Sequence, residues 1–177
     1  MVRQGRARAC RAAVDRLLAA GHRRIAFLAH ADEHGGVLAD SVKLRSYREG
    51  LAAHGIDLDP ELVRPVADSR SDAYAAVRDL LRRPDAPTAL LSATDRAAID
   101  GIWAARDLGV AVPDELAVIG IGNIPEGLMI SPALTSVGAA ALDFSREVAR
   151  LFERLDASTP LPGAELAAPW ELSLIHI

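Results

Sequence analysis

The spacing of apolar residues changes repeatedly along this chain between the period of a helix and that of a buried strand. Four helical stripes are predicted, near residues 7–18, 44–51, 74–81 and 95–108. Short apolar runs typical of buried strands alternate with them, at residues 25–29, 62–66, 89–92 and 116–121. Helices and strands in strict alternation favour right-handed crossovers. The predicted fold class is therefore α/β, with a parallel sheet covered by helices on both faces.

Glycines and small polar residues mark the expected helix ends. Gly21, Gly55 and Gly109 follow three of the stripes, as residues that end helices commonly do. Ser71 is predicted to cap the third helix. Asp95 opens the fourth helix directly after a strand, which predicts a cap at its positive end, a polar group facing a ligand, or both.

Beyond Gly122 the spacing of apolar residues is less regular. A short strand is predicted at residues 134–137 and a last strand at residues 166–170. Between them, one helical stripe is formed by five residues, Phe144, Val148, Leu151, Phe152 and Leu155.

Composition excludes several classes of protein. With 177 residues, half of them hydrophobic, the chain is long and apolar enough for one core. The single cysteine, Cys10, excludes an internal disulfide, and its place on an apolar helix face predicts a buried, inert thiol. No apolar run is long enough to span a membrane, and no secretory leader is visible. We therefore expect a globular protein of the cytoplasm that does not bind membranes.

Catalytic and metal-binding signals are weak. No nucleophile elbow, zinc-protease or phosphate-loop motif is present, so we expect a protein that is not an enzyme and carries no cofactor. His30, Asp32, Glu33 and His34 have metal-ligand side chains, but the following Gly35-Gly36 favours a solvated loop. Seven arginines near the N-terminus indicate a solvated helix face rather than a nucleic-acid contact: Arg3, Arg6, Arg8, Arg11, Arg16, Arg23 and Arg24.

Three segments follow predicted strands directly. They are residues 30–43, 94–95 and 122–125. In parallel sheets ligands bind outside the carboxyl ends of the strands. These segments are therefore the predicted ligand-binding loops.

Four motifs in order carry a family resemblance: GHRRIAFL at 21–28, PTALLSATD at 87–95, GVAVPDELAVIGIGN at 109–123 and SPALTSV at 131–137. Together they resemble the effector-binding domain of LacI/GalR-type transcription regulators, which shares its fold with periplasmic sugar-binding proteins. The resemblance extends from about residue 5 to 171.

The resemblance implies a two-lobed sensor that holds a small-molecule effector, such as a sugar, in the cleft between its lobes. It also implies a homodimer that binds operator DNA through a headpiece absent from this chain. Residues 5–137 and 163–171 correspond to the C-terminal lobe, whereas residues 141–156 correspond to a helix of the missing N-terminal lobe. Without that lobe we expect the helix to expose an apolar face and to promote self-association. Residues 172–177, LSLIHI, resemble a translated transposase end and are expected to be a non-native tail.

The resemblance also assigns effector-binding residues, Lys43, Thr94, Asp95, Gly122 and Asn123. Lys43 stands where the family has an arginine, and it lacks the planar fork that grips two oxygens. Gly122 replaces an aspartate. These departures favour an effector other than a simple neutral hexose, either an anion that contacts Lys43 or, alternatively, a loss of sensing.

Two other classes of protein remain open from the sequence. A substrate-binding protein of a transporter has the same fold but needs export. A nucleotide-binding enzyme of the Rossmann type needs a glycine-rich GxGxxG turn after the first strand, where AHADEHGG stands instead.

Overall fold

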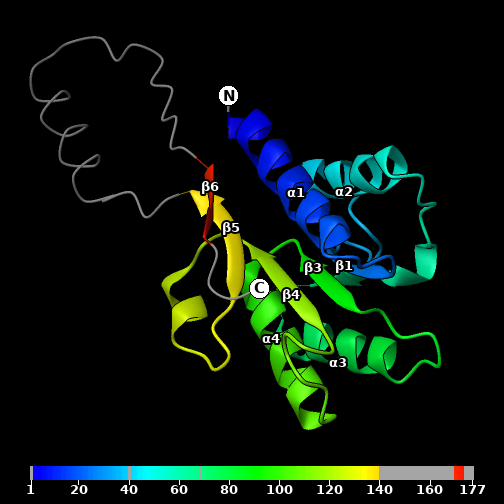
Figure 1. Ribbon diagram of the computed structural model, residues 1–177, viewed down its shortest axis with the longest axis vertical. Helices are drawn as coiled ribbons and strands as arrows, with labels where there is room; N and C mark the ends of the chain where they lie inside the picture. The colour runs from blue at the N-terminus through cyan, green and yellow to red at the C-terminus, as the bar shows by residue number, and fades with distance from the viewer. Residues whose placement is uncertain (1, 40, 68, 140–169, 174–177) are drawn as a thin grey trace, which may run out of the picture.

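The computed structural model describes residues 2–39, 41–67, 69–139 and 170–173. At its centre lies a six-stranded sheet in the order β2–β1–β3–β4–β5–β6 (Figure 1). Neighbouring strands among β1 to β5 run parallel to one another, whereas the last strand, β6, is antiparallel to β5. The strands are β1 (Ile25–His30), β2 (Val63–Val66), β3 (Ala89–Ser92), β4 (Ala117–Ile121), β5 (Thr135–Ala139) and β6 (Trp170–Ser173).

Helices cover both faces of the sheet, as the alternating sequence pattern predicts. Helices α1 (Val2–Ala19) and α2 (Val42–Ala53) pack together on one face, and α3 (Arg70–Leu81) and α4 (Asp95–Asp107) pack together on the other (Figure 1). Two short 3-10 helices, η1 (Pro60–Leu62) and η2 (Pro125–Leu128), lie in the connections. No helix in the described part of the chain is long and apolar enough to cross a membrane.

Successive residues of β1 belong to the two halves of the core. Phe27 packs in the cluster formed with α1 and α2, whereas Leu28 packs in the cluster formed with α3 and α4. Both side chains are fully buried. Since the side chains of a strand alternate between its two faces, an all-apolar strand requires helices on both sides. The continuous apolar runs in the sequence therefore correspond to the covered parallel strands.

Cys10 connects the two helices of one layer. Its thiol is buried and donates to the carbonyl oxygen of Lys43 at 3.2 Å. Burial raises the pKa of Cys10 to about 12, and the Lys43 charge lowers it by a smaller amount. The prediction that Cys10 is buried is confirmed, and a thiol with this pKa stays protonated at neutral pH.

Two predicted boundaries are wrong. Helix α3 begins at Arg70 with Ser69 as its N-cap residue, so Ser71 lies inside the first turn and does not cap the helix. The last strand begins at Trp170, where the sequence predicts that it ends, and extends to Ser173 in the expected non-native tail. The predicted helical stripe between Phe144 and Leu155 lies outside the described residues.

Candidate functional site

The three predicted binding loops lie at one edge of the sheet. Each follows one of the strands β1, β3 and β4, which are neighbours and run parallel. Parallel neighbours direct their carboxyl ends to the same edge, so the loops meet there. The structure thus confirms the position of the loops that the sequence predicts.

The first loop folds into a short hairpin. Ala31 and Val37 form an antiparallel bridge, and the Asp32 carboxylate accepts hydrogen bonds from the amides of His34 (2.9 Å) and Gly36 (2.8 Å). Asp32 therefore organises the turn itself. No group of three or more histidine, cysteine, aspartate or glutamate side chains suited to a metal ion is found among the described residues.

Lys43 contributes a positive charge to this edge. It lies in the first turn of α2, which Ser41 caps by accepting a hydrogen bond from the Leu44 amide. The Lys43 ammonium group donates to the carbonyl oxygen of Ala93, immediately after β3. Lys43 therefore bridges the first and second loops.

Asp95 is the buried centre of the edge, with only 1% of its surface exposed. One carboxylate oxygen accepts from the Ser136 hydroxyl at 2.6 Å, and the other accepts from the Ile124 amide at 2.8 Å. The same Ser136 oxygen accepts from the Asn123 amide at 2.9 Å. Asp95 thus fastens the start of α4 to the loop after β4 and to β5.

The cap of α4 is Thr94, not Asp95. The Thr94 side chain accepts from the Ala97 amide at 3.2 Å, as an N-cap residue does. The prediction that Asp95 caps this helix is wrong, because its carboxylate is turned toward Ile124 and Ser136.

Glycines make the close packing around Asp95 possible. A Cβ atom on Gly120 would overlap the Asp95 carboxylate, and one on Gly138 would lie 2.5 Å from the Cβ of Asn123. Gly122 has φ +157°, at the limit of the region that disfavours side chains, and Asn123 has φ 58°, within the left-handed region. The loop after β4 therefore depends on small residues on both sides of the carboxylate.

Acidification provides a test of this environment. Burial raises the pKa of Asp95 above its ordinary value of 3.8, while the hydrogen bonds from Ser136 and the loop amides and the charge of Lys43 lower it by smaller amounts. A raised pKa means that the folded chain holds this proton more tightly than the unfolded chain. The contribution of Asp95 to the free energy of unfolding therefore increases as the pH falls through the folded-state pKa toward 3.8.

We expect the free energy of unfolding of the wild-type chain, minus that of Asp95→Asn, to rise between about pH 7 and about pH 4.5. Urea denaturation at several pH values measures this difference, and the asparagine variant cancels the contributions of all other carboxylates. A difference that falls on acidification would show that the folded chain favours the ionised carboxylate.

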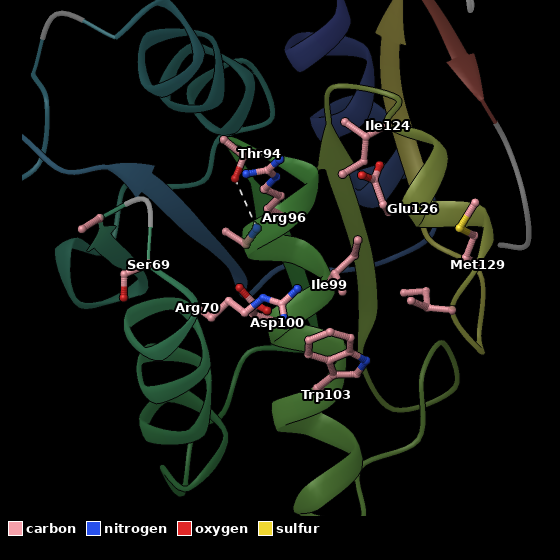
Figure 2. A pocket seen from close by; sticks show the side chains of 13 residues that line it. Ser69, Arg70, Thr94, Arg96, Ile99, Asp100, Trp103, Ile124, Glu126 and Met129 are labelled. Atoms are coloured by element: carbon pink, nitrogen blue, oxygen red, sulfur yellow. Dashed lines mark hydrogen bonds between the residues drawn. The ribbon is translucent and has the colours of Figure 1, made fainter.

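A cavity of about 430 Å³ opens between α3, α4 and the segment around η2 (Figure 2). Thr94 is the one predicted binding residue in its lining. The cavity extends from Thr94 along α4 to Trp103, and its far wall includes Glu126 and Met129 (Figure 2). Lys43, Gly122 and Asn123 do not line it, whereas Thr94 and Ile124 belong both to the edge loops and to the cavity wall.

Two important residues were missed from the sequence. Ser136 orders the loop after β4, but a serine in a strand carries no signal of its own partners. Asp100 lies in the cavity wall and is 5% exposed. The sequence could have indicated Asp100, because this acidic residue interrupts the apolar face of the helix predicted at residues 95–108.

The fold and the edge loops define a ligand-binding domain of the periplasmic-binding-protein type. Residues 14–174 match the family model described as "Periplasmic binding protein-like domain", and the chain belongs to this family. Its relatives in that family include LacI-type transcription regulators, as the motifs indicate.

Two transcription regulators are similar to this chain in sequence. The chain is 33% identical over 153 residues to the HTH-type transcriptional regulator CelR of Thermobifida fusca, and the aligned residues make up 86% of this chain and 44% of that protein. It is also 33% identical over 145 residues to the HTH-type transcriptional regulator AscG of Escherichia coli, and the aligned residues make up 81% of this chain and 42% of that protein. The chain thus spans less than half the length of either regulator.

Solved structures of transcription regulators are similar to this chain in fold as well as in sequence. The complex of the transcriptional regulator CelR with cellobiose has a TM-score of 0.71 and 33% identity, covering 89% of this chain and 47% of that chain. The Escherichia coli transcriptional repressor AscG has a TM-score of 0.70 and 31% identity, covering 87% of this chain and 55% of that chain.

Proposed function

We propose that this chain is the effector-sensing part of a LacI-type transcription regulator and binds a small polar molecule without chemical turnover. The observation that carries the proposal is the convergence of the loops after β1, β3 and β4 at one edge of the sheet, linked by Lys43 and Asp95. The names of the relatives support a regulator rather than an enzyme or a transporter's binding protein.

The proposed domain arrangement follows the family. Residues 5–137 and 163–171 form one lobe, and residues 141–156 belong to the second lobe. The effector lies between the lobes, and its binding is linked to operator binding by a DNA-binding headpiece of a cytoplasmic homodimer. Linkage requires the effector to bind the two lobe arrangements with different affinities. In this arrangement the edge described above is one wall of the effector cleft.

The five predicted residues have different roles in this proposal. Lys43 and Asn123 contact the effector, because both are partly exposed at the edge. Thr94 lies at the start of α4, and its hydroxyl oxygen caps that helix. Asp95 positions the loop that carries Asn123 and Gly122, since its carboxylate is buried. Gly122 gives the effector access to the backbone where an aspartate side chain stands in the family.

Lys43 determines the preferred charge of the effector. The lysine retains a positive charge, and no carboxylate stands at position 122 to balance an additional sugar hydroxyl. A charged hydrogen bond contributes about 1.5–3 kcal/mol, which is about a tenfold to a hundredfold change in affinity. We therefore expect an acidic sugar such as glucuronate to bind more tightly than glucose.

Calorimetric titration of the complete regulator that carries this chain tests the proposal. We expect Lys43→Met to weaken glucuronate binding by about tenfold and to leave the affinity for glucose nearly unchanged. Arg48→Met is the matched control, because it removes one positive charge from an exposed position of the same helix. Tight binding of glucose or cellobiose, unaffected by Lys43→Met, would keep the sensor and refute the anionic effector. No binding of any of these sugars, and no change in operator affinity on adding them, would count against the sensor itself.

A further inference from the structure

Leu38 is an exposed apolar side chain in the first of the three edge loops. It keeps 42% of its surface exposed and is one of three large apolar side chains that are exposed in the described part of the chain. The other two, Leu128 and Met129, lie next to each other at η2. Single exposed leucines are common on protein surfaces, so the position of Leu38 decides whether it has a role.

The backbone of Leu38 is held on both sides. Its amide donates to the carbonyl oxygen of His30, the last residue of β1, at 2.9 Å. Its own carbonyl oxygen accepts from the amide of Ser41, the residue that caps α2, at 3.2 Å. The residue before it, Val37, is bridged to Ala31. Leu38 therefore belongs to the hydrogen-bonded framework of the edge.

These bonds place Leu38 at the carboxyl end of β3. The carbonyl oxygen of Leu28 in β1 accepts from the amide of Ala93, directly after β3. Residues two apart on a strand direct their backbone groups to the same neighbouring strand, so the His30 carbonyl that binds Leu38 also faces the β3 side. The Lys43 ammonium group reaches the same place, because it donates to the carbonyl oxygen of Ala93. The apolar side chain and the positive charge therefore both lie where β3 ends.

The core does not use the Leu38 side chain. Val37 packs against the core cluster formed with α1 and α2, and side chains alternate along an extended segment, so Leu38 is directed away from that cluster. Neither core cluster includes Leu38 among the described residues. A leucine that is fixed by its backbone and left out of the core offers its methyl groups to a ligand at the edge.

An apolar group close to a cation favours a ligand that carries both kinds of group. Ligand sites are lined mostly by apolar side chains, and a few polar groups fix the orientation of the ligand. An acidic sugar offers its carboxylate to Lys43, but its hydroxyl groups gain little from Leu38. An alkyl or aryl substituent on that sugar would cover the leucine. Covering about half of a leucine side chain increases affinity by about fivefold.

We propose that Leu38 is a specificity-determining residue of the effector site, and that the effector is an anionic sugar with an alkyl or aryl substituent that packs on Leu38. The inference rests on the proposed function, since it assigns a second chemical group to the effector of that same site.

Calorimetric titration of the complete regulator with glucuronate and with phenyl glucuronide tests this assignment. We expect the wild-type protein to bind phenyl glucuronide about fivefold more tightly than glucuronate. Leu38→Ala should remove this preference and leave the affinity for glucuronate unchanged, whereas Leu38→Met, which keeps the apolar volume, should retain it. Leu128→Ala is the matched control, because it shortens an exposed leucine outside the three edge loops.

The heat-capacity change of binding gives a second measurement. Burial of apolar surface makes this change more negative, so we expect a more negative value for phenyl glucuronide than for glucuronate, and a smaller difference in Leu38→Ala. A purely structural role of Leu38 would weaken the binding of both sugars alike.

Equal affinities of the wild-type protein for the two sugars, a preference that Leu38→Ala leaves intact, or an equal loss for both sugars would overturn the role of Leu38 and leave the sensor in place. Binding of glucose or cellobiose, but of neither acidic sugar, would also overturn it. If none of these sugars binds, the effector site itself is refuted, and the role of Leu38 with it.

Discussion

Replacing Gly120 by alanine is expected to lower the free energy of unfolding by about 3 kcal/mol. The added methyl group would overlap the Asp95 carboxylate and would lie 3.1 Å from the Asp95 Cα atom and 3.1 Å from a methyl carbon of Leu134. The clash involves backbone as well as side chains, so rotation of one side chain cannot relieve it. Strand β4 is buried along its whole length and paired on both sides, which prevents it from moving away.

Chemical denaturation measures this effect, with Gly55→Ala as the control. Gly55 has φ +68°, but a Cβ atom there would meet nothing within 4 Å. We therefore expect the control to cost only the backbone strain, about 1–2 kcal/mol. Equal losses in the two variants would mean that the surroundings of Gly120 can yield, and that the Asp95 region is less rigid than its packing indicates.

Removing the Asp95 side chain is the second change with a large expected effect. Asp95→Ala leaves the Ile124 amide and the Ser136 hydroxyl without their acceptor, and each unsatisfied buried group costs about 1–3 kcal/mol. We expect a total loss of about 3 kcal/mol, reduced to about 1 kcal/mol in Asp95→Asn, whose amide oxygen still accepts one bond. Denaturation of both variants at neutral pH gives the two values.

Hydrogen exchange of the Asn123 and Ile124 amides separates the local effect from the global one. Both amides should exchange faster in Asp95→Ala than its overall loss of stability explains, since the carboxylate orders the loop directly. The double variant with Gly120→Ala should lose less than the sum of the two single changes, because the methyl group and the carboxylate compete for the same space. Additive losses would contradict this close contact.

Much of the fold was predictable from the spacing of apolar residues. The runs at residues 25–29 and 89–92 correspond to β1 and β3, because a strand covered on both faces has few positions for polar residues. Pro65 lies in the second strand, and it is tolerated there because β2 lies at the edge of the sheet. The convergence of three loops at one edge followed from the parallel order alone.

The partners of individual polar side chains were not predictable in the same way. The sequence marked Asp95 as a polar residue after a strand, but its bond to Ser136 joins residues 41 positions apart. Likewise, Asp100 was visible as an acid in an apolar stripe, whereas its burial depends on α3 and the segment around η2.

The sequence by itself determined the α/β class, the order of the elements and the family, because periodicity and turn residues act over a few neighbouring positions. Only the tertiary structure decided that Thr94 caps α4, that Asp95 holds the loop after β4, and that Asp100 lies in the wall of a cavity. The physical reason is that a hydrogen bond or a buried charge depends on distances between segments remote in the chain, which local patterns do not encode.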